Sequence, residues 1–359
     1  MFGKRFMGLV VLFVAAVLLV LLIGPAQADP QAPAQTTIVV DSGTDPDDSK
    51  SATCINATPC TLRRAIVQAI DDDTVRPVTI SFNIPADPVE GYNSALGVWE
   101  LEVYPTNDTT VFRRLEGGQI TIDGSTQPGG RSEGPKIILI GPGTGNKRGL
   151  NIGNSPQSGD DDNVIRGLGF QNFTLAISVN SNGNLIEDNW FGLTSDGSDV
   201  FLRSAGPQDG SGSGGVGLSG NVTDNTITGN VFLGFDGAAV AVRGDDNIVR
   251  ANYIGTAASG NVPGKQTAPD LICTKVDWLG GGGITLEGER HVIEDNIIAG
   301  LRQEISGTAT QPNAISVSGG GHTISNNDIG LAKNDAEVGV CGRGIYLGSA
   351  PIANSVEGN

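Results

Sequence analysis

The sequence predicts an all-β fold, a right-handed parallel β-helix solenoid with an N-terminal α/β cap, and three observations lead to this prediction. The first is a repeat in which a polar residue is followed by an aliphatic residue two places on and by Asn five places on, usually with Gly soon after. The second is a short run of alternating apolar residues ahead of each copy. The third is a shortest spacing of 21 residues, because a unit of that length buries its apolar face only by stacking on its neighbours.

Copies of this repeat occupy the C-terminal two-thirds of the chain. They begin at Asn163, Asn184, Asn225, Asn247, His291, His322 and Asn354, so their separations are 21, 41, 22, 44, 31 and 32 residues. Period-2 alternation, β-branched residues and frequent Gly and Asn turns favour strands over helices. Stacked coils of such strands form parallel sheets, and their connections are right-handed.

The recurrent polar residues are expected to stack in two columns inside the corners of the coils. Equivalent residues of successive coils lie about 4.8 Å apart, so their amides hydrogen-bond along the axis. Asn also tolerates the left-handed backbone of a sharp corner. The first column is Asn189, Asn230, Asn252, Asn296, Asn327 and Asn359. The second column is Asn184, Asn225, Asn247, His291, His322 and Asn354, which makes the two histidines ladder members rather than catalysts.

Residues 1–28 have the features of a secretory signal peptide. Lys4 and Arg5 precede an apolar run, and a small-residue cleavage site ends at Ala28. The alternative is a membrane anchor, for which the run is slightly short. Cleavage removes two of the 22 basic residues and none of the 39 acidic ones, so the mature chain has a net charge of −19. This charge argues against nucleic acid as a partner, and no membrane attachment is expected after cleavage.

Residues 29–116 are expected to cap the solenoid. They contain a strand at 36–40, an amphipathic helix N-capped by Thr61, and a second strand at 78–84. Such a cap covers the open edge and the apolar end of the first coil. Residues 86–116 show no regular pattern and are expected to pack between cap and coils.

Residues 117–359 are expected to form the β-helix itself. The alternating runs QITIDGS, KIILIGP and GLNIGNS give its first strands, joined by Gly, Pro and Ser turns. The chain is expected to be a fragment, because Asn359 is the second Asn of an unfinished repeat and a solenoid needs a closing cap.

The four cysteines form a close pair, Cys54 and Cys60, and a distant pair, Cys273 and Cys341. An exported chain permits disulfides, and we expect one between the close pair. The distant pair lies in insertions two coils apart, and its pairing is left open. No Cys-x-x-Cys motif occurs, so no zinc site is expected. No cofactor is expected; the acidic turn at 41–48 leaves calcium as the alternative to a solvated turn, although it lacks the spacing of an EF-hand loop.

The cap also carries a family resemblance. The segment from Cys60 through Thr-Leu-Arg-Arg to Ala65 resembles the Cys-Ser-Leu-Arg-Glu-Ala segment that names the CSLREA-domain bacterial surface proteins, and it departs from that segment at Thr61 and Arg64. Residues 120–129 and 252–256 are also similar to stretches that recur in such proteins. The resemblance implies a secreted, pectate-lyase-like β-helix, and it transfers no catalytic residue.

Insertions are expected at one corner of the coils, after Gly192, Gly255, Gly300 and Gly330. Loops stacked on one side of a rigid column form a groove, although surface loops also tolerate length at little cost. The side chains expected there to hold an acidic sugar, by stacking and by charge, are Trp278, Lys265, Lys275 and Arg343. A second candidate is the outward pair Trp190 and Tyr253, for which packing under an insertion is the alternative.

These features predict a secreted or cell-surface β-helix repeat protein for adhesion, glycan contact or envelope structure, with polysaccharide or cell-envelope components as partners. The alternative is a polysaccharide lyase or glycoside hydrolase that acts on acidic polysaccharide. Such enzymes need carboxylates clustered in register. Asp188 and Asp295 occupy equivalent places, but Gly229 and Ala251 stand there in the coils between them, so the sequence identifies no catalytic residue and favours the non-enzymatic alternative.

Overall fold

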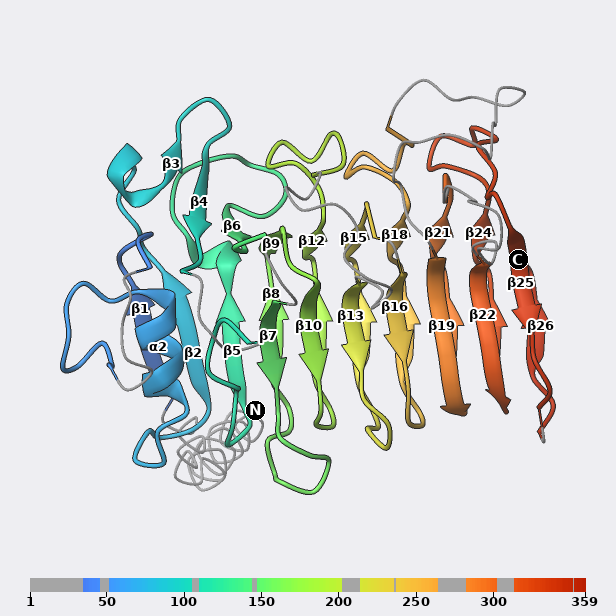
Figure 1. Cartoon of the computed structure of the whole chain (residues 1–359), viewed down its shortest axis with the longest axis horizontal. Helices are drawn as coiled ribbons and strands as arrows, with labels where there is room; N and C mark the ends of the chain where they lie inside the picture. Colours follow the sequence, from blue (N-terminus) through green and yellow to red (C-terminus); the bar gives the residue numbers. More distant parts are fainter. Residues whose placement is uncertain are drawn as a thin grey trace, which may run out of the picture. The chain divides into compact units, whose positions relative to one another are not determined.

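The computed structural model shows a right-handed parallel β-helix from residue 35 onward. The described residues are 35–45, 52–104, 110–143, 147–201, 214–235, 237–263, 282–301, 313–350 and 352–359. Figure 1 shows its strands following one another in chain order along three sheets. Among the named strands, only β3 (Tyr92–Asn93) and β4 (Val98–Glu102) pair antiparallel. In the described part of the chain, no helix has the length and apolar character needed to cross a membrane.

Each sheet collects equivalent strands from successive coils. Sheet A contains β1 (Thr36–Val40), β2 (Val78–Phe82), β5 (Ile120–Asp123), β8 (Val164–Arg166), β11 (Leu185–Glu187), β14 (Thr226–Thr228), β17 (Ile248–Arg250), β20 (Val292–Glu294), β23 (Thr323–Ser325) and β26 (Ser355–Glu357). Sheet B contains β3, β4, β6 (Ile137–Ile140), β9 (Leu168–Gln171), β12 (Trp190–Phe191), β15 (Val231–Phe232), β18 (Tyr253–Ile254), β21 (Ile297–Ile298) and β24 (Asp328–Ile329). Sheet C contains β7 (Arg148–Ile152), β10 (Leu175–Val179), β13 (Gly214–Leu218), β16 (Ala238–Val242), β19 (Gly282–Glu289), β22 (Asn313–Gly320) and β25 (Arg343–Leu347).

The core is a set of aliphatic and aromatic stacks that run along the axis. From β8 to β23, the middle residue of each three-residue strand in sheet A is buried, which gives the series Ile165, Ile186, Ile227, Val249, Ile293 and Ile324. In sheet B, the rings of Phe170 and Phe191 stack at 5.1 Å between centroids, and those of Phe191 and Phe232 at 4.7 Å. Period-2 alternation therefore gives every coil an inner and an outer face.

The first asparagine column lies at the corner between sheets A and B, as the sequence predicts. At Asn252, which is fully buried, Oδ1 accepts from the backbone N–H of Asn230 at 3.0 Å and from its Nδ2 at 3.1 Å. The Nδ2 of Asn252 donates in turn to Oδ1 of Asn296 at 3.0 Å and to two backbone carbonyls. The same pattern extends from Asn189 to Asn359.

The left-handed backbone at this corner belongs to a different residue from the one we expected. The residue before each ladder Asn has positive φ, with 55° at Asp188, 52° at Ala251 and 57° at Asp295. Gly is suited to this conformation because it has no Cβ, and short polar side chains tolerate it. The mixture of Gly, Asp and Ala at this position is thus explained by corner geometry, and the ladder Asn is selected for its amide.

The second column lies at the corner between sheets C and A, and it includes both histidines. Nδ1 of His291 accepts from the N–H of Asn247 at 3.2 Å, and Nδ1 of His322 accepts from the N–H of His291 at 3.1 Å. The two buried rings stack at 5.0 Å between centroids. A ring nitrogen that accepts carries no proton, so both imidazoles are held neutral with the proton on Nε2. The interpretation of both as ladder members is confirmed.

The cap elements also match the sequence, with one exception. Helix α2 (Leu62–Ala69) is N-capped by Thr61, and β1 and β2 continue sheet A in parallel. The expectation that residues 86–116 are irregular is wrong: they contain η1 (Pro88–Glu90), β3 and β4, and β4 pairs in parallel with β6. The alternation places Trp99 and Leu101 of this strand, and Val103 directly after it, in the core. A second 3-10 helix, η2 (Gly124–Thr126), follows β5.

His291 and His322 in the second column make the stability of the fold depend on pH. Burial lowers the pKa of both His291 and His322 below the ordinary 6.5, although Asp245, Asp246 and Glu289 nearby oppose this shift. Below pH 6.5 the unfolded chain takes up protons that the folded chain does not, so stability is full above this value and falls as the pH decreases. We therefore expect the free energy of unfolding to decrease as the pH is lowered from 7.5 to 5.5.

The matched control is the double variant His291→Asn and His322→Asn, which restores the residue found in the other rungs. Thermal unfolding of both proteins at pH 7.5 and pH 5.5 measures the effect. The double variant is expected to lose less stability than the parent between these two values. An equal loss in both proteins would contradict the role assigned to the rings.

Candidate functional site

The insertion loops form a second layer over the outer face of sheet B. Their described parts follow β12, β18, β21 and β24, which all end at the same corner. Hydrogen bonds connect the loops to one another. The N–H of Ala258 donates to the Gly197 carbonyl at 3.0 Å, and the N–H of Lys333 donates to the Gly260 carbonyl at 3.1 Å. Apolar side chains such as Leu193 and Val231 are buried between the loops and the sheet. This corner is therefore packed wherever the structure describes it.

The outward aromatic residues lie beneath this layer. The guanidinium of Arg131 lies 4.4 Å from the ring centre of Trp190, and Gly134 and Gly197 come so close to the indole that a Cβ on either would collide with it. The ammonium of Lys333 lies 5.4 Å from the ring centre of Tyr253. Both aromatic side chains are half-buried. Their contacts support the packing alternative, because other parts of the chain already occupy the ring surfaces.

Of the other predicted site residues, only Arg343 lies in the described part of the chain. Arg343 lies at the start of β25 in sheet C, where its guanidinium stacks at 4.6 Å on Tyr346, so it is on a different sheet from Trp190 and Tyr253. Lys265, Lys275 and Trp278 lie outside the described residues.

The cysteines and the acidic turn are structural where they are described. Cys54 and Cys60 form a disulfide, as predicted. Cys341 is also disulfide-bonded, while Cys273 lies outside the described residues. In the described part of the chain, no group of three or more His, Cys, Asp or Glu side chains is placed to hold a metal ion.

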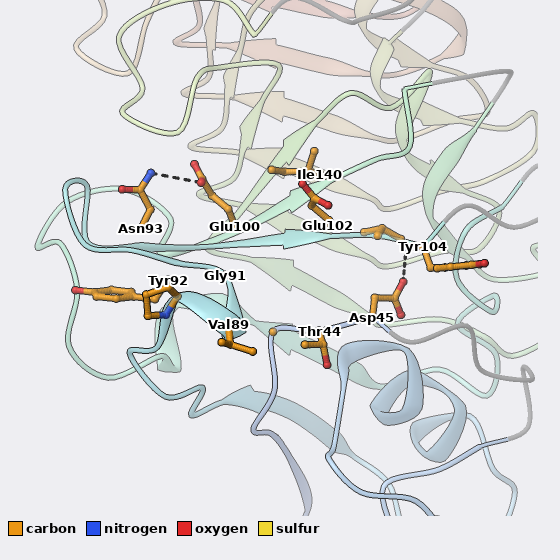
Figure 2. A pocket seen from close by; sticks show the side chains of 13 residues that line it. Thr44, Asp45, Val89, Gly91, Tyr92, Asn93, Glu100, Glu102, Tyr104 and Ile140 are labelled. Carbon is orange, nitrogen blue, oxygen red and sulfur yellow. Dashed lines mark hydrogen bonds between the residues drawn. The ribbon is translucent and has the colours of Figure 1, made fainter.

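A groove of about 740 Å³ opens at the N-terminal end of sheet B, which lies within the range of about 300–1,000 Å³ typical of ligand pockets. Its floor is the outer side of β4, from which Glu100 and Glu102 project (Figure 2). Figure 2 shows Tyr92 and Asn93 at one end of the groove and Asp45 and Tyr104 at the other. The remaining lining residues are Gly43, Thr44, Pro88, Val89, Gly91, Val103 and Ile140.

The two ends of the groove are held by buried contacts. At one end, the ring of Tyr92 packs on Trp99 with 4.7 Å between centroids, and Trp99 donates its Nε1–H to the Pro85 carbonyl at 2.8 Å. Between the ends, Glu90 fastens the loop after β1, because its Oε2 accepts from the hydroxyl of Ser42 at 2.6 Å and from the N–H of Gly43 at 2.7 Å. The walls are thus preformed rather than assembled around a ligand.

At the other end, Arg63 of α2 is the central contact. Its guanidinium binds both oxygens of Asp45, at 2.7 Å and 2.6 Å, and donates to the backbone carbonyls of Val111 and Tyr104. Asp45 also accepts from the Tyr104 N–H at 2.6 Å. The side chains of Arg63 and Asp45 are only 3% and 9% exposed. The arginine of the segment that resembles the CSLREA motif therefore joins the helix, the loop after β1 and the end of β4.

The groove is not predicted from the sequence, although one signal for it is present there. The alternation of Val98-Trp-Glu-Leu-Glu102 places two carboxylates on one outer face, but this strand lacks the ladder Asn that marks the later coils. The pairing of Arg63 with Asp45 is not visible in the sequence, because no local pattern links residues 18 positions apart.

Comparisons with known proteins find remote similarities in structure. No family model matches the chain, and no curated protein matches it. Among solved structures, a tailspike protein mutant of E. coli bacteriophage HK620 in complex with pentasaccharide is similar at 13% identity with a TM-score of 0.35, covering 83% of this chain and 56% of that chain. A pectate lyase from Bacillus sp. N165 in complex with trigalacturonate is similar at 12% identity with a TM-score of 0.26, covering 90% of this chain and 83% of that one. The resemblance to CSLREA-domain proteins stays a prediction.

The contact between Arg63 and Asp45 gives a prediction about stability. Arg63→Ala leaves a nearly buried carboxylate unpaired, and we expect a loss of about 3–5 kcal/mol in the free energy of unfolding. Arg63→Lys keeps the positive charge but cannot form the bidentate contact with Asp45, so we expect an intermediate loss in the free energy of unfolding. Urea unfolding measures both.

The control is Arg250→Ala, which removes an arginine exposed on the outer face of sheet A and is expected to change stability by less than about 0.5 kcal/mol. Equal effects of Arg63→Ala and Arg250→Ala would show that the contact at Arg63 does not hold the cap.

Proposed function

We propose that this chain is an exported or cell-surface β-helix protein that binds a glycan in the groove on β4 without altering it chemically. The observation that carries this proposal is the exposed aromatic residue Tyr104 together with the carboxylates of Glu100 and Glu102 in one open, preformed groove. Aromatic faces stack on the apolar faces of sugar rings, and carboxylates accept hydrogen bonds from sugar hydroxyls. The signal-like segment at 1–28 and the Cys54–Cys60 disulfide support export.

The arrangement of the carboxylates favours contact over catalysis. Glycoside hydrolases place an acid and a second carboxylate on opposite sides of the bond that is cleaved. Here Glu100 and Glu102 leave the same side of one strand, two residues apart. Asp45, at the other wall, is bound by Arg63 and by the Tyr104 N–H, so its oxygens already accept from the protein. A lyase or hydrolase that acts on acidic polysaccharide remains the competing function.

A binding test separates these functions. The full chain is passed over immobilised neutral, amino and uronate polysaccharides, and the soluble products are assayed for new reducing or unsaturated ends. We expect retention on at least one polysaccharide and no new ends. Release of ends by an activity that co-purifies with the chain through every step would overturn the non-catalytic proposal.

The substitution Tyr104→Ala tests whether the glycan binds in the groove on β4. Tyr104, a residue that is 39% exposed, contacts Asp45 and Arg63 through its backbone, so this substitution removes the ring and keeps those contacts. We expect an about tenfold loss of affinity for the retained glycan, with thermal unfolding nearly unchanged.

The matched control is Tyr346→Ala. Tyr346 is similarly exposed, at 42%, and lies beside Arg343, which the sequence pointed to as a ligand residue. We expect the Tyr346→Ala variant to bind the retained glycan with the same affinity as the parent protein. Loss of binding in Tyr346→Ala but not in Tyr104→Ala would move the site from the groove to the region of Arg343.

A further inference from the structure

The groove has an excess of negative charge that the chain does not neutralise. Its charged lining residues in the described part of the chain are Asp45, Glu100 and Glu102, and no Lys, Arg or His lines it there. Arg63 neutralises Asp45 from behind the wall. Glu100 accepts only a long hydrogen bond of 3.4 Å from the amide of Asn93, and Glu102 has no hydrogen bond or ion pair from the side chains of the described residues. Two carboxylates are thus available to a ligand.

The edge of β4 adds a backbone donor beside these carboxylates. Trp99 and Val103 direct their N–H groups to β6, so the alternate residues Glu100, Glu102 and Tyr104 direct theirs to the opposite edge. The N–H of Glu100 bonds to the Gly91 carbonyl at 2.8 Å and that of Tyr104 to Asp45 at 2.6 Å. Between them, the N–H of Glu102 lies at the groove and donates to no described residue.

The short free edge of β4 favours a sugar over a peptide as the ligand. An extended peptide that adds to a sheet needs several consecutive free backbone groups. Here the N–H of Glu102 is the one edge donor of β4 without a described acceptor, because the N–H of Glu100 on one side donates to Gly91 and that of Tyr104 on the other donates to Asp45. A sugar ring is compact, and it needs a few convergent polar groups beside an aromatic face, which Glu100, Glu102 and Tyr104 supply.

We infer that the groove selects oligosaccharides with free amino groups, such as deacetylated hexosamine units, over uronates; this rests on the proposed glycan binding. A protonated amine forms charge-assisted hydrogen bonds with Glu100 and Glu102. A uronate would instead bring a further negative charge to a groove that has two carboxylates and no basic side chain among its described lining residues. Selectivity for the amine therefore comes from both carboxylates, mainly from Glu102 because Glu100 also accepts from Asn93, whereas stacking on Tyr104 stabilises any bound sugar.

The test is a calorimetric titration of the full chain with a glucosamine oligosaccharide under conditions where its amines are protonated. The N-acetylated oligosaccharide and a galacturonate oligosaccharide of the same length are titrated in parallel. We expect the glucosamine oligosaccharide to bind tightest, with an advantage that shrinks at high salt because the charges are exposed.

The discriminating variant is Glu102→Gln, which keeps the shape of the side chain and removes its charge. We expect an about tenfold loss of affinity for the glucosamine oligosaccharide and a change of less than about twofold for the N-acetylated one. The matched control is Glu133→Gln, which removes an exposed carboxylate that does not line the groove and should leave both affinities unchanged.

The outcomes separate this inference from the proposal beneath it. Equal binding of the glucosamine and N-acetylated oligosaccharides, unaffected by Glu102→Gln, overturns the selectivity and leaves glycan binding intact. Tightest binding of galacturonate also overturns the selectivity. Binding of none of the three, with oligolysine bound in a manner that depends on Glu102, overturns both and indicates a basic peptide. Binding of no probe at all overturns both as well.

Discussion

The buried amide ladder is the interaction on which the rest of the structure depends. At the corner between sheets A and B, the backbone turns away from one sheet and its N–H groups need another acceptor. The Oδ1 of the next asparagine supplies it, as between Asn230 and Asn252 at 3.0 Å. A buried N–H left without a partner costs about 1–3 kcal/mol, so each rung removes a penalty that would otherwise recur in every coil.

The ladders also decide where the chain can vary. Two of the three connections in each coil carry a column, one ending at residues such as Asn252 and the other at residues such as Asn247. The connection from sheet A to sheet B has two residues in every coil from β11 to β24, because its amides must stay in register. The connection from sheet C to sheet A varies more, with five residues between β10 and β11 and seven between β13 and β14. The third connection, from sheet B to sheet C, has no column, and it is the one that carries the insertions after Gly192, Gly255, Gly300 and Gly330. Loop length is tolerated there because no buried hydrogen bond depends on it.

Much of the fold could be predicted from the sequence, because it repeats on a local scale. The two columns, helix α2, the first disulfide and the ladder role of His291 and His322 follow from spacing and residue type. The left-handed residue was misplaced by one position, since spacing alone does not reveal whether Asp188 or Asn189 turns the corner. The packing of Arg131 on Trp190 could not be predicted, because it joins segments that no repeat relates. The groove was missed for the same reason: it combines the loop after β1, η1 and β4, and each contributes residues with no shared pattern.

Hydrogen exchange of the side-chain amides tests the ladder most directly. Asn230, Asn252 and Asn296 are fully buried and donate through Nδ2, whereas Asn221 is exposed in a turn. If the columns hold the coils together, the Nδ2 hydrogens of the first three exchange only when the coils open, at rates comparable with the backbone amides of the same coils and far slower than those of Asn221. Side-chain exchange of the three ladder residues as fast as that of Asn221, with the backbone amides of their coils still protected, would contradict the account.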